Sequence, residues 1–232
     1  MRLQSKDLSG IGTFLGYGNP TAKIWFVGGE EGFGGRMSED ERLDSLVMRA
    51  SWSPIRDMYE AHLELMEAGQ PIDISKPRKG SVAVWRWMAR IYLTLAEFDY
   101  EEAKRRDREY VYNRLGRTFG ETFLTEVSPF PCVTARKPHP AVAIAAAAPN
   151  RQRTSELRKL REATDPLLIC YGLGRRHEFR DLFDLTWTPL DGFGGRVLAD
   201  TTGRAFLLPF FGQGQMSHEL ARQFCNAVRT VD

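Results

Sequence analysis

The chain has 232 residues, of which 42% are hydrophobic, a length and composition that suit one domain with a normal core. Its 32 basic and 30 acidic residues give a formal net charge of +2, which permits nucleic-acid binding without requiring it. Three scattered cysteines without a CxxC pair argue against a disulfide framework, a cysteine-ligated metal site or an iron–sulfur cluster. No apolar leader or run of 18 apolar residues occurs, so we expect a cytoplasmic protein with no membrane segment. We also expect a monomer with one domain over residues 1–232.

The first predicted strand, residues 23–27, leads into a glycine-rich segment at residues 28–35. An apolar strand that enters glycines is typical of ligand-binding strand ends in α/β proteins. Ser38 and Glu41 form the pattern of a capping box, which predicts that an amphipathic helix begins there. Further helices are predicted at residues 58–66, 81–98, 101–117 and 154–164, after the glycines at 172–174, and from about 218 to 228.

Three more strands are predicted at residues 122–127, 167–171 and 205–211. Each ends in glycine or proline, and helices separate the strands along the chain. This alternation predicts a parallel sheet with both faces covered. We therefore expect an α/β fold with three layers, α/β/α, around a central, mostly parallel four-stranded sheet.

The ends of these four strands, in their order along residues 17–228, resemble the motifs of the uracil-DNA glycosylase superfamily. In that family the first strand ends in a motif of the type GQDPY or GEAPG, and residues 28–32 (GGEEG) stand there after the lead-in 18–23 (GNPTAK). Glu30 falls on the position of the family's water-activating carboxylate. The resemblance implies that Glu30, with Glu31 beside it, stabilises positive charge on the sugar and orients water. The alternative is a solvated pair of loop residues.

The second family motif ends in an Asn that reads the edge of a flipped pyrimidine, and here Glu126 stands in its place. Asn offers a donor and an acceptor, which match N3–H and O4 of uracil. An ionised carboxylate only accepts, so we expect Glu126 to repel O4 of uracil and to favour the amino group of a cytosine-type base. The alternative is a register shift that makes Glu126 an ordinary ion-pair residue.

The third segment, residues 167–174, is a strand before a GxG turn and is a weak signal. In the fourth segment the family has His-Pro-Ser and then a wedge residue that enters the DNA helix. Here residues 212–217 (GQGQMS) occupy that place, with Gly212 on the His position and Met216 on the wedge position. Two glycines in this loop favour a pocket that admits a bulky base.

Several side chains are candidates for the remaining contacts. The resemblance implies an aromatic ring beneath the flipped base, and Phe33 and Trp52 are the candidates. The alternative for Trp52 is a buried structural role. Gln213 is a candidate for the missing donor to the base. The predicted DNA contacts are Arg36, Lys79, Gln215, Met216, Ser217 and His218. Further basic residues at 76–78, 136–137 and 175–176 are also expected to contact DNA.

These features predict a monofunctional DNA glycosylase that needs no cofactor or metal. It would flip and excise a modified pyrimidine, such as glucosylated hydroxymethylcytosine in phage DNA, and leave an abasic site. The alternatives are a repair glycosylase for uracil or another deaminated base, or a non-catalytic nucleic-acid-binding member of the fold. An unrelated nucleotide-binding α/β protein is disfavoured, because the first turn lacks the P-loop and GxGxxG patterns and its carboxylates would repel phosphate.

Overall fold

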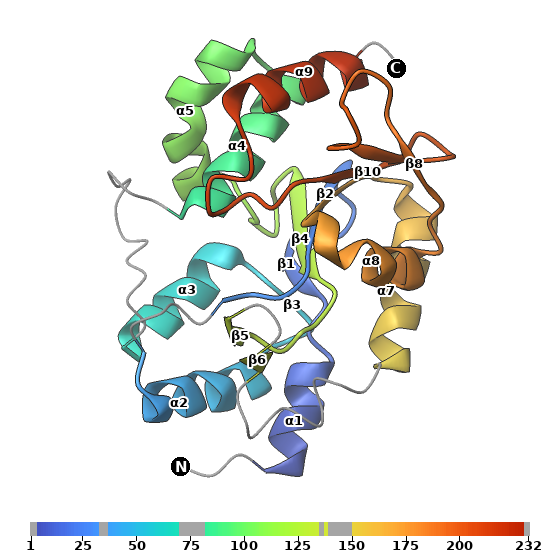
Figure 1. Ribbon diagram of the computed structural model, residues 1–232. Coiled ribbons are helices and arrows are strands. Elements are labelled where there is room, and N and C mark those ends of the chain that lie inside the picture. Colours follow the sequence, from blue (N-terminus) through green and yellow to red (C-terminus); the bar gives the residue numbers. More distant parts are fainter. Residues whose placement is uncertain (1–3, 33–36, 70–81, 135–136, 139–149, 230–232) are drawn as a thin grey trace.

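A computed structural model describes residues 4–32, 37–69, 82–134, 137–138 and 150–229. Its centre is a mixed eight-stranded sheet with the order β3-β1-β4-β2-β7-β10-β9-β8 (Figure 1). A separate two-stranded sheet pairs β5 with β6. The strands are β1 (Gly16–Gly18), β2 (Ile24–Gly28), β3 (Ile55–Arg56), β4 (Thr122–Glu126), β5 (Cys132–Thr134), β6 (Lys137–Pro138), β7 (Leu167–Tyr171), β8 (Trp187–Pro189), β9 (Leu198–Asp200) and β10 (Ala205–Leu208).

The four predicted strands form the centre of this sheet, where β4, β2, β7 and β10 are mutually parallel. The prediction of a four-stranded sheet was wrong, because two strands extend it on each side. β1 and β9 join antiparallel to β4 and β10, and β3 and β8 form the edges. These added strands have only two or three residues, too few for a period-two pattern to be visible in the sequence. β10 ends at Leu208, before Pro209, which has no N–H to donate.

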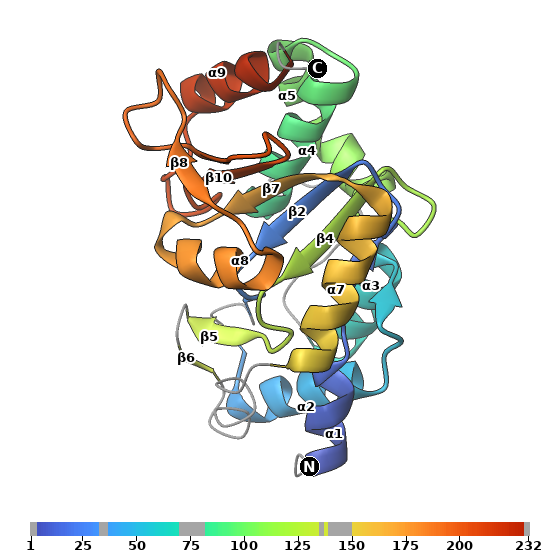
Figure 2. The same cartoon turned by 90° about the vertical axis from the view of Figure 1, so that its right-hand side faces the viewer.

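Helices cover both faces of the sheet, so the predicted three-layer α/β arrangement is present (Figures 1 and 2). On one face Phe26 and Leu124 pack into a core shared with α3, α4, α5 and α9, and on the other Trp25 and Phe123 pack against α7 and α8. Neighbouring residues of one strand thus enter opposite cores, as the pleat of a strand requires. The helices are α1 (Ser5–Gly12), α2 (Glu39–Ala50), α3 (Met58–Glu67), α4 (Ala83–Ala96), α5 (Tyr100–Asn113), α7 (Arg151–Thr164), α8 (Arg176–Phe183) and α9 (His218–Arg229), with the short 3-10 helix η2 (Leu173–Arg175).

The helix termini agree with the local signals of the sequence. The predicted capping box is present at the start of α2: the Glu41 N–H donates to Ser38 Oγ at 3.3 Å, and the Ser38 N–H donates to Glu41 Oε2 at 2.6 Å. α5 ends at Asn113, earlier than predicted, and the chain then turns through Gly116, whose φ of +63° suits glycine. No helix in the described part of the chain is long and apolar enough to cross a membrane.

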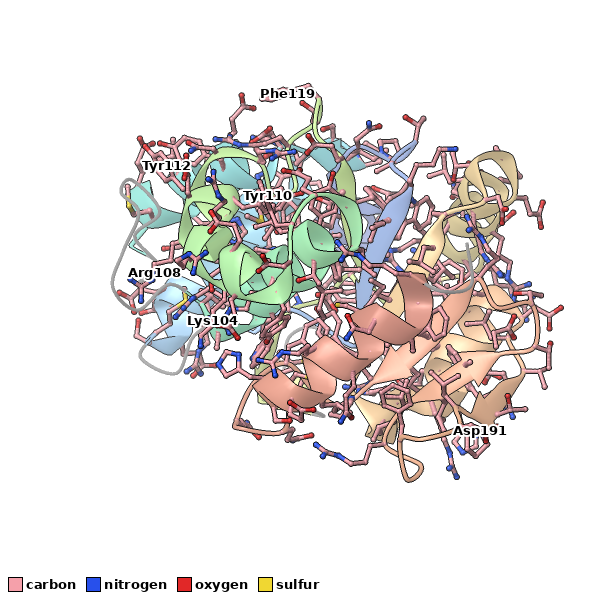
Figure 3. All side chains as sticks on the ribbon, turned by 90° about the horizontal axis from the view of Figure 1, so that it is seen from above. Lys104, Arg108, Tyr110, Tyr112, Phe119 and Asp191 are labelled. Carbon is pink, nitrogen blue, oxygen red and sulfur yellow. The ribbon has the colours of Figure 1, made fainter. Side chains whose placement is uncertain are left out.

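Helices α4 and α5 are joined by a buried ion pair. Asp107 of α5, only 1% exposed, accepts hydrogen bonds from Arg86 (3.1 Å) and Arg90 (2.5 Å) of α4. Figure 3 shows this end of the molecule from above, with Lys104 and Arg108 along α5. Phe119, 81% exposed, lies beyond α5 at the outer edge of the same view. The pair fixes α5 on α4, since an unpaired carboxylate would be costly to bury.

We expect Asp107→Ala to lower the free energy of unfolding by about 3–5 kcal/mol, because it leaves the buried Arg90 without its counter-ion. Urea unfolding at pH 7 measures this loss. Glu156→Ala is the matched control: Glu156 pairs with Lys159 on the surface of α7 at 3.1 Å. Its loss should stay below about 1 kcal/mol. Equal losses in the two variants would contradict a structural role for Asp107.

Candidate functional site

The carboxyl ends of β2 and β4 open into one cavity of about 410 Å³. Glu30 and Glu31 line it from the segment after β2, and Glu126 lines it from the last position of β4. The remaining wall is largely apolar and aromatic. The aromatic lining residues are Phe14, Tyr17, Trp85, Tyr171 and Phe210. The structure therefore brings together the three carboxyl groups that the sequence singled out.

Backbone pairing holds the segment after β2 in place beyond the end of the strand. The N–H groups of Val127 and Ser128 donate to the carbonyl oxygens of Gly28 (2.8 Å) and Gly29 (2.9 Å), and the Cys132 N–H donates to that of Glu31 (2.8 Å). Consecutive side chains of an extended segment point in opposite directions. Glu31 accordingly meets α2 and α3, while Glu30 meets the end of η2.

Glu31 is held as a carboxylate by three side chains. Arg49 of α2 donates to both carboxyl oxygens at 2.8 Å, and the Tyr17 hydroxyl donates at 2.9 Å. His62 of α3 donates from Nδ1 to the Met58 carbonyl oxygen at 2.8 Å, and its Nε2 lies 3.5 Å from Glu31 Oε1. Burial alone would raise the pKa of Glu31, but Arg49 and His62 outweigh it and hold that pKa well below its usual range. Glu31 is therefore ionised and fixed.

Glu30 is paired with a different cation. Its carboxylate accepts a hydrogen bond from Arg175, which lies at the end of η2 and also donates to Glu178 at 2.5 Å. The Glu30 side chain is 8% exposed, against 24% for Glu31. Of the two side chains, that of Glu31 is thus the more exposed.

Glu126 has no cation on its carboxyl group among the described residues. Its Oε1 accepts from the Tyr171 hydroxyl at 3.0 Å, and its Oε2 is buried without a described hydrogen-bond partner. Burial raises the pKa of Glu126 to about 8, and the charges of Glu31 and Glu30 add to this, while Tyr171 and Arg153 partly oppose it. The group is therefore mostly protonated at pH 7. This corrects the sequence-based expectation that Glu126 is a carboxylate that can only accept.

Gly28 makes room for this carboxyl group. It pairs with Glu126 across β2 and β4, and a Cβ atom on Gly28 would overlap both Glu126 Oε2 and the Tyr171 hydroxyl. Only glycine leaves that space without displacing one of them. The first glycine of the predicted motif thus has a steric role in the site.

Arg153 of α7 is buried beneath the site, 3% exposed, and binds main-chain oxygens. It donates to the carbonyl oxygens of Phe14 (2.5 Å), Val127 (2.9 Å) and Glu126 (2.6 Å). Burial lowers the pKa of Arg153 to about 10, which leaves it charged at pH 7. Arg153 therefore ties the end of β4 to the segment before β1 and does not neutralise the Glu126 carboxyl.

Trp52 does not line the cavity. It is 6% exposed, its Nε1 donates to Glu64 at 2.9 Å, and the Arg49 guanidinium lies 4.9 Å from its ring centroid. Trp52 therefore has the structural role that the sequence analysis gave as the alternative, and it packs against the Arg49 guanidinium. Phe33, Arg36 and Lys79, three other predicted site residues, lie outside the described residues.

The predicted fourth segment also lies outside the cavity lining. Gln213 and Gln215 are exposed in a tight turn, and Met216 is 5% exposed in the hydrophobic core, so it does not protrude as a wedge. Ser217 accepts from the Leu220 N–H at 3.2 Å and caps α9. His218, the first residue of α9, contacts the Tyr100 hydroxyl at 2.8 Å. None of these side chains lines the cavity, so none of them replaces the family's His there.

Sequence reasoning missed five residues that contact Glu31 or Glu126. Tyr171 ends a predicted strand, so its position at the sheet edge could have been inferred. The other four belong to no motif, and only the packing of α2, α3, α7 and β1 brings them to the carboxyl groups. They are Tyr17, Arg49, His62 and Arg153.

Comparison of the chain with protein-family models, with curated proteins and with solved structures gave no match. Among the described residues, no group of three or more His, Cys, Asp or Glu side chains is placed to hold a metal ion. All three cysteines are free and buried, and Cys170 is a core residue. The structure thus establishes an α/β protein with an acidic, aromatic cavity, and its family stays a prediction.

The lowered pKa of Glu31 predicts a specific loss of stability in acid. A carboxyl whose pKa is depressed by folding stabilises the protein above its unfolded pKa of about 4.3, and this contribution falls as the pH drops towards the folded value. Between pH 4.3 and 3.5 the free energy of unfolding of the wild type should fall by about 1 kcal/mol more than that of Glu31→Gln. Urea unfolding across pH 3.5–7 measures the difference. Glu60→Gln, at an exposed position of α3, should keep the wild-type slope, and a Glu31→Gln slope equal to it would contradict the assignment.

Proposed function

We propose that this protein is a monofunctional DNA glycosylase of the uracil-DNA glycosylase superfamily, which flips a modified pyrimidine into the cavity and hydrolyses its N-glycosidic bond. The observation that carries the proposal is that one aromatic-lined cavity contains carboxyl groups from the ends of the adjacent parallel strands β2 and β4. Ligands of α/β proteins bind outside the carboxyl ends of such strands. Enzymes that act on a base within DNA need an enclosed pocket for it.

The state of Glu31 suits the electrostatic part of this reaction. As the base leaves with the electron pair of the C1′–N1 bond, positive charge develops on the sugar and water adds its oxygen to C1′. A fixed carboxylate in a poorly solvated pocket stabilises that charge. Glu31 is ionised and accessible, so we assign it this role, with Glu30 as a second carboxylate whose charge Arg175 balances.

The rest of the cavity suits a flat base. Phe14, Trp85 and Phe210 supply rings against which a base can stack, in place of Trp52. The volume of about 410 Å³ lies within the range of roughly 300–1,000 Å³ that is typical of small-molecule pockets. It leaves space for a substituent on the pyrimidine, which supports a bulky 5-substituted cytosine, such as glucosylated hydroxymethylcytosine of phage DNA, and a role in phage defence.

A wider groove beside the cavity supports DNA as the partner. It has a volume of about 900 Å³ and shares Ser128, Pro129 and Arg153 with the cavity lining. Arg151, Arg158 and Lys159 of α7 line it, together with Arg175 and the acidic residues Glu162, Glu178 and Asp181. Basic side chains at a pocket mouth can hold the phosphates on either side of a flipped nucleotide.

Uracil or another deaminated base is the second candidate substrate, and one observation favours it. Because the Glu126 carboxyl is mostly protonated, it can donate a hydrogen bond to O4, so the expected repulsion of uracil disappears. A repair glycosylase is therefore compatible with the same cavity. A non-catalytic protein that binds nucleic acid is the remaining alternative.

Release of the base by Glu31→Gln tests the catalytic assignment. We expect kcat to fall by about 10²- to 10³-fold, as for loss of a group that stabilises transition-state charge. The kcat of Glu30→Gln should fall less, because the Glu30 side chain is less exposed than that of Glu31. Conversion of abasic sites to strand breaks in single-turnover reactions measures the rate. Glu60→Gln should act as wild type. Equal release by wild type, Glu31→Gln and Glu30→Gln would remove both residues from the mechanism.

A panel of otherwise identical oligonucleotides tests the substrate. It should contain glucosylated 5-hydroxymethylcytosine, 5-hydroxymethylcytosine, cytosine, uracil or thymine at one position. We expect the glucosylated base to be released fastest, because the cavity leaves space beyond the pyrimidine ring. Release of uracil alone would select the repair glycosylase, and binding without any abasic product would select the non-catalytic alternative.

A further inference from the structure

We infer that Glu126 reads the flipped base as a neutral carboxylic acid, so that the cavity selects pyrimidines with a hydrogen-bond donor and an acceptor side by side on one edge. This inference rests on the proposed function and deepens it. It differs from a carboxylate reader, which would require an amino group on the base. Both cytosine-type and uracil-type edges satisfy a neutral acid.

The cations around the cavity are already engaged by other groups. Arg49 binds both oxygens of Glu31, and Arg175 binds Glu30. Arg153 directs its guanidinium to main-chain carbonyl oxygens, including that of Glu126 itself. An ionised Glu126 would thus be a third anion in the cavity without a cation of its own, which is strongly unfavourable when buried.

The immediate surroundings of the carboxyl group also fit the neutral form. The Tyr171 hydroxyl donates to Oε1 at 3.0 Å, so Oε1 is an acceptor and the acid proton belongs on Oε2. Oε2 is buried, without a described hydrogen-bond partner, against the backbone of Gly28. The neutral carboxyl therefore has a donor at Oε2 and an acceptor at Oε1, which is the same pair of functions as a side-chain amide.

The groups that face Glu126 from each packed element act in opposite directions, and those that raise its pKa prevail. Glu31 and Glu30, after β2, raise its pKa in addition to burial, and Tyr171 of β7 and Arg153 of α7 lower it by less. Because its pKa lies near 8, the acid is present through the neutral range and is lost as the pH rises above 8. A reader that depends on the acid must lose activity in the same range.

The test compares Glu126→Gln with Glu126→Ala in single-turnover release of the best base of the panel between pH 6 and 9. The Gln amide reproduces the donor and acceptor and does not ionise. We expect it to retain wild-type activity within about tenfold at pH 6.5 and to lack the alkaline fall, whereas wild-type kcat/KM should fall towards tenfold per pH unit above about 8. Glu126→Ala should lose at least about 10²-fold. Glu60→Gln is the control and should keep the wild-type pH profile.

A wild-type rate that stays constant to pH 9, or a Glu126→Gln variant as inactive as Glu126→Ala at pH 6.5, would overturn the inference. Carbon-13 NMR of labelled glutamate provides a readout that does not depend on activity: one carboxyl resonance, absent in Glu126→Gln, should titrate near pH 8. An active wild type with an ionised Glu126 at pH 6.5 would overturn this inference alone. A wild type that releases no base from any oligonucleotide would overturn the proposed function, and the reading of a base with it.

Discussion

Three carboxyl groups share one poorly solvated cavity, and the arrangement around it keeps their mutual repulsion tolerable. Parallel pairing of β2 with β4 sets Gly28 opposite Glu126, which brings the glutamates after β2 next to the one that ends β4. Charges of one sign buried together are expensive unless each is paired or neutralised. The side chains that surround the cavity can be understood as responses to this constraint.

The protein answers the constraint differently for each carboxyl group. Glu31 is an anion because a bidentate arginine, a tyrosine hydroxyl and a histidine surround its carboxylate. Its side chain is also exposed enough to face a ligand. Glu30 is neutralised by Arg175 and is nearly buried. Glu126 has no cation and keeps its proton. Groups of one chemical type thus acquire an anionic and a neutral form within one cavity, which is how pairs of carboxyls in enzymes divide their roles.

The surrounding architecture makes these differences durable. Arg153 ties the end of β4 to the segment before β1, and Trp52 packs under the Arg49 guanidinium. These residues contact the carboxyl groups only indirectly, yet they fix the positions from which the cations and carbonyls act. A site built on strand ends and supported by buried side chains is preorganised, as electrostatic stabilisation of a developing charge requires.

The sequence by itself determined the four central strands, the capping box of α2 and the positions of Glu30, Glu31 and Glu126 at strand ends. These features depend on local pattern: apolar runs that stop at glycine, and a serine three residues before a glutamate. It could not show the short edge strands, which have too few residues for a pattern, or the burial of Met216 and Trp52. Only the tertiary structure decided which cation meets which carboxylate, because Arg49, Arg153 and Arg175 come from separate helices and turns. The protonation of Glu126 follows from that distribution, since a pKa depends on burial and on neighbouring charges that no local pattern contains.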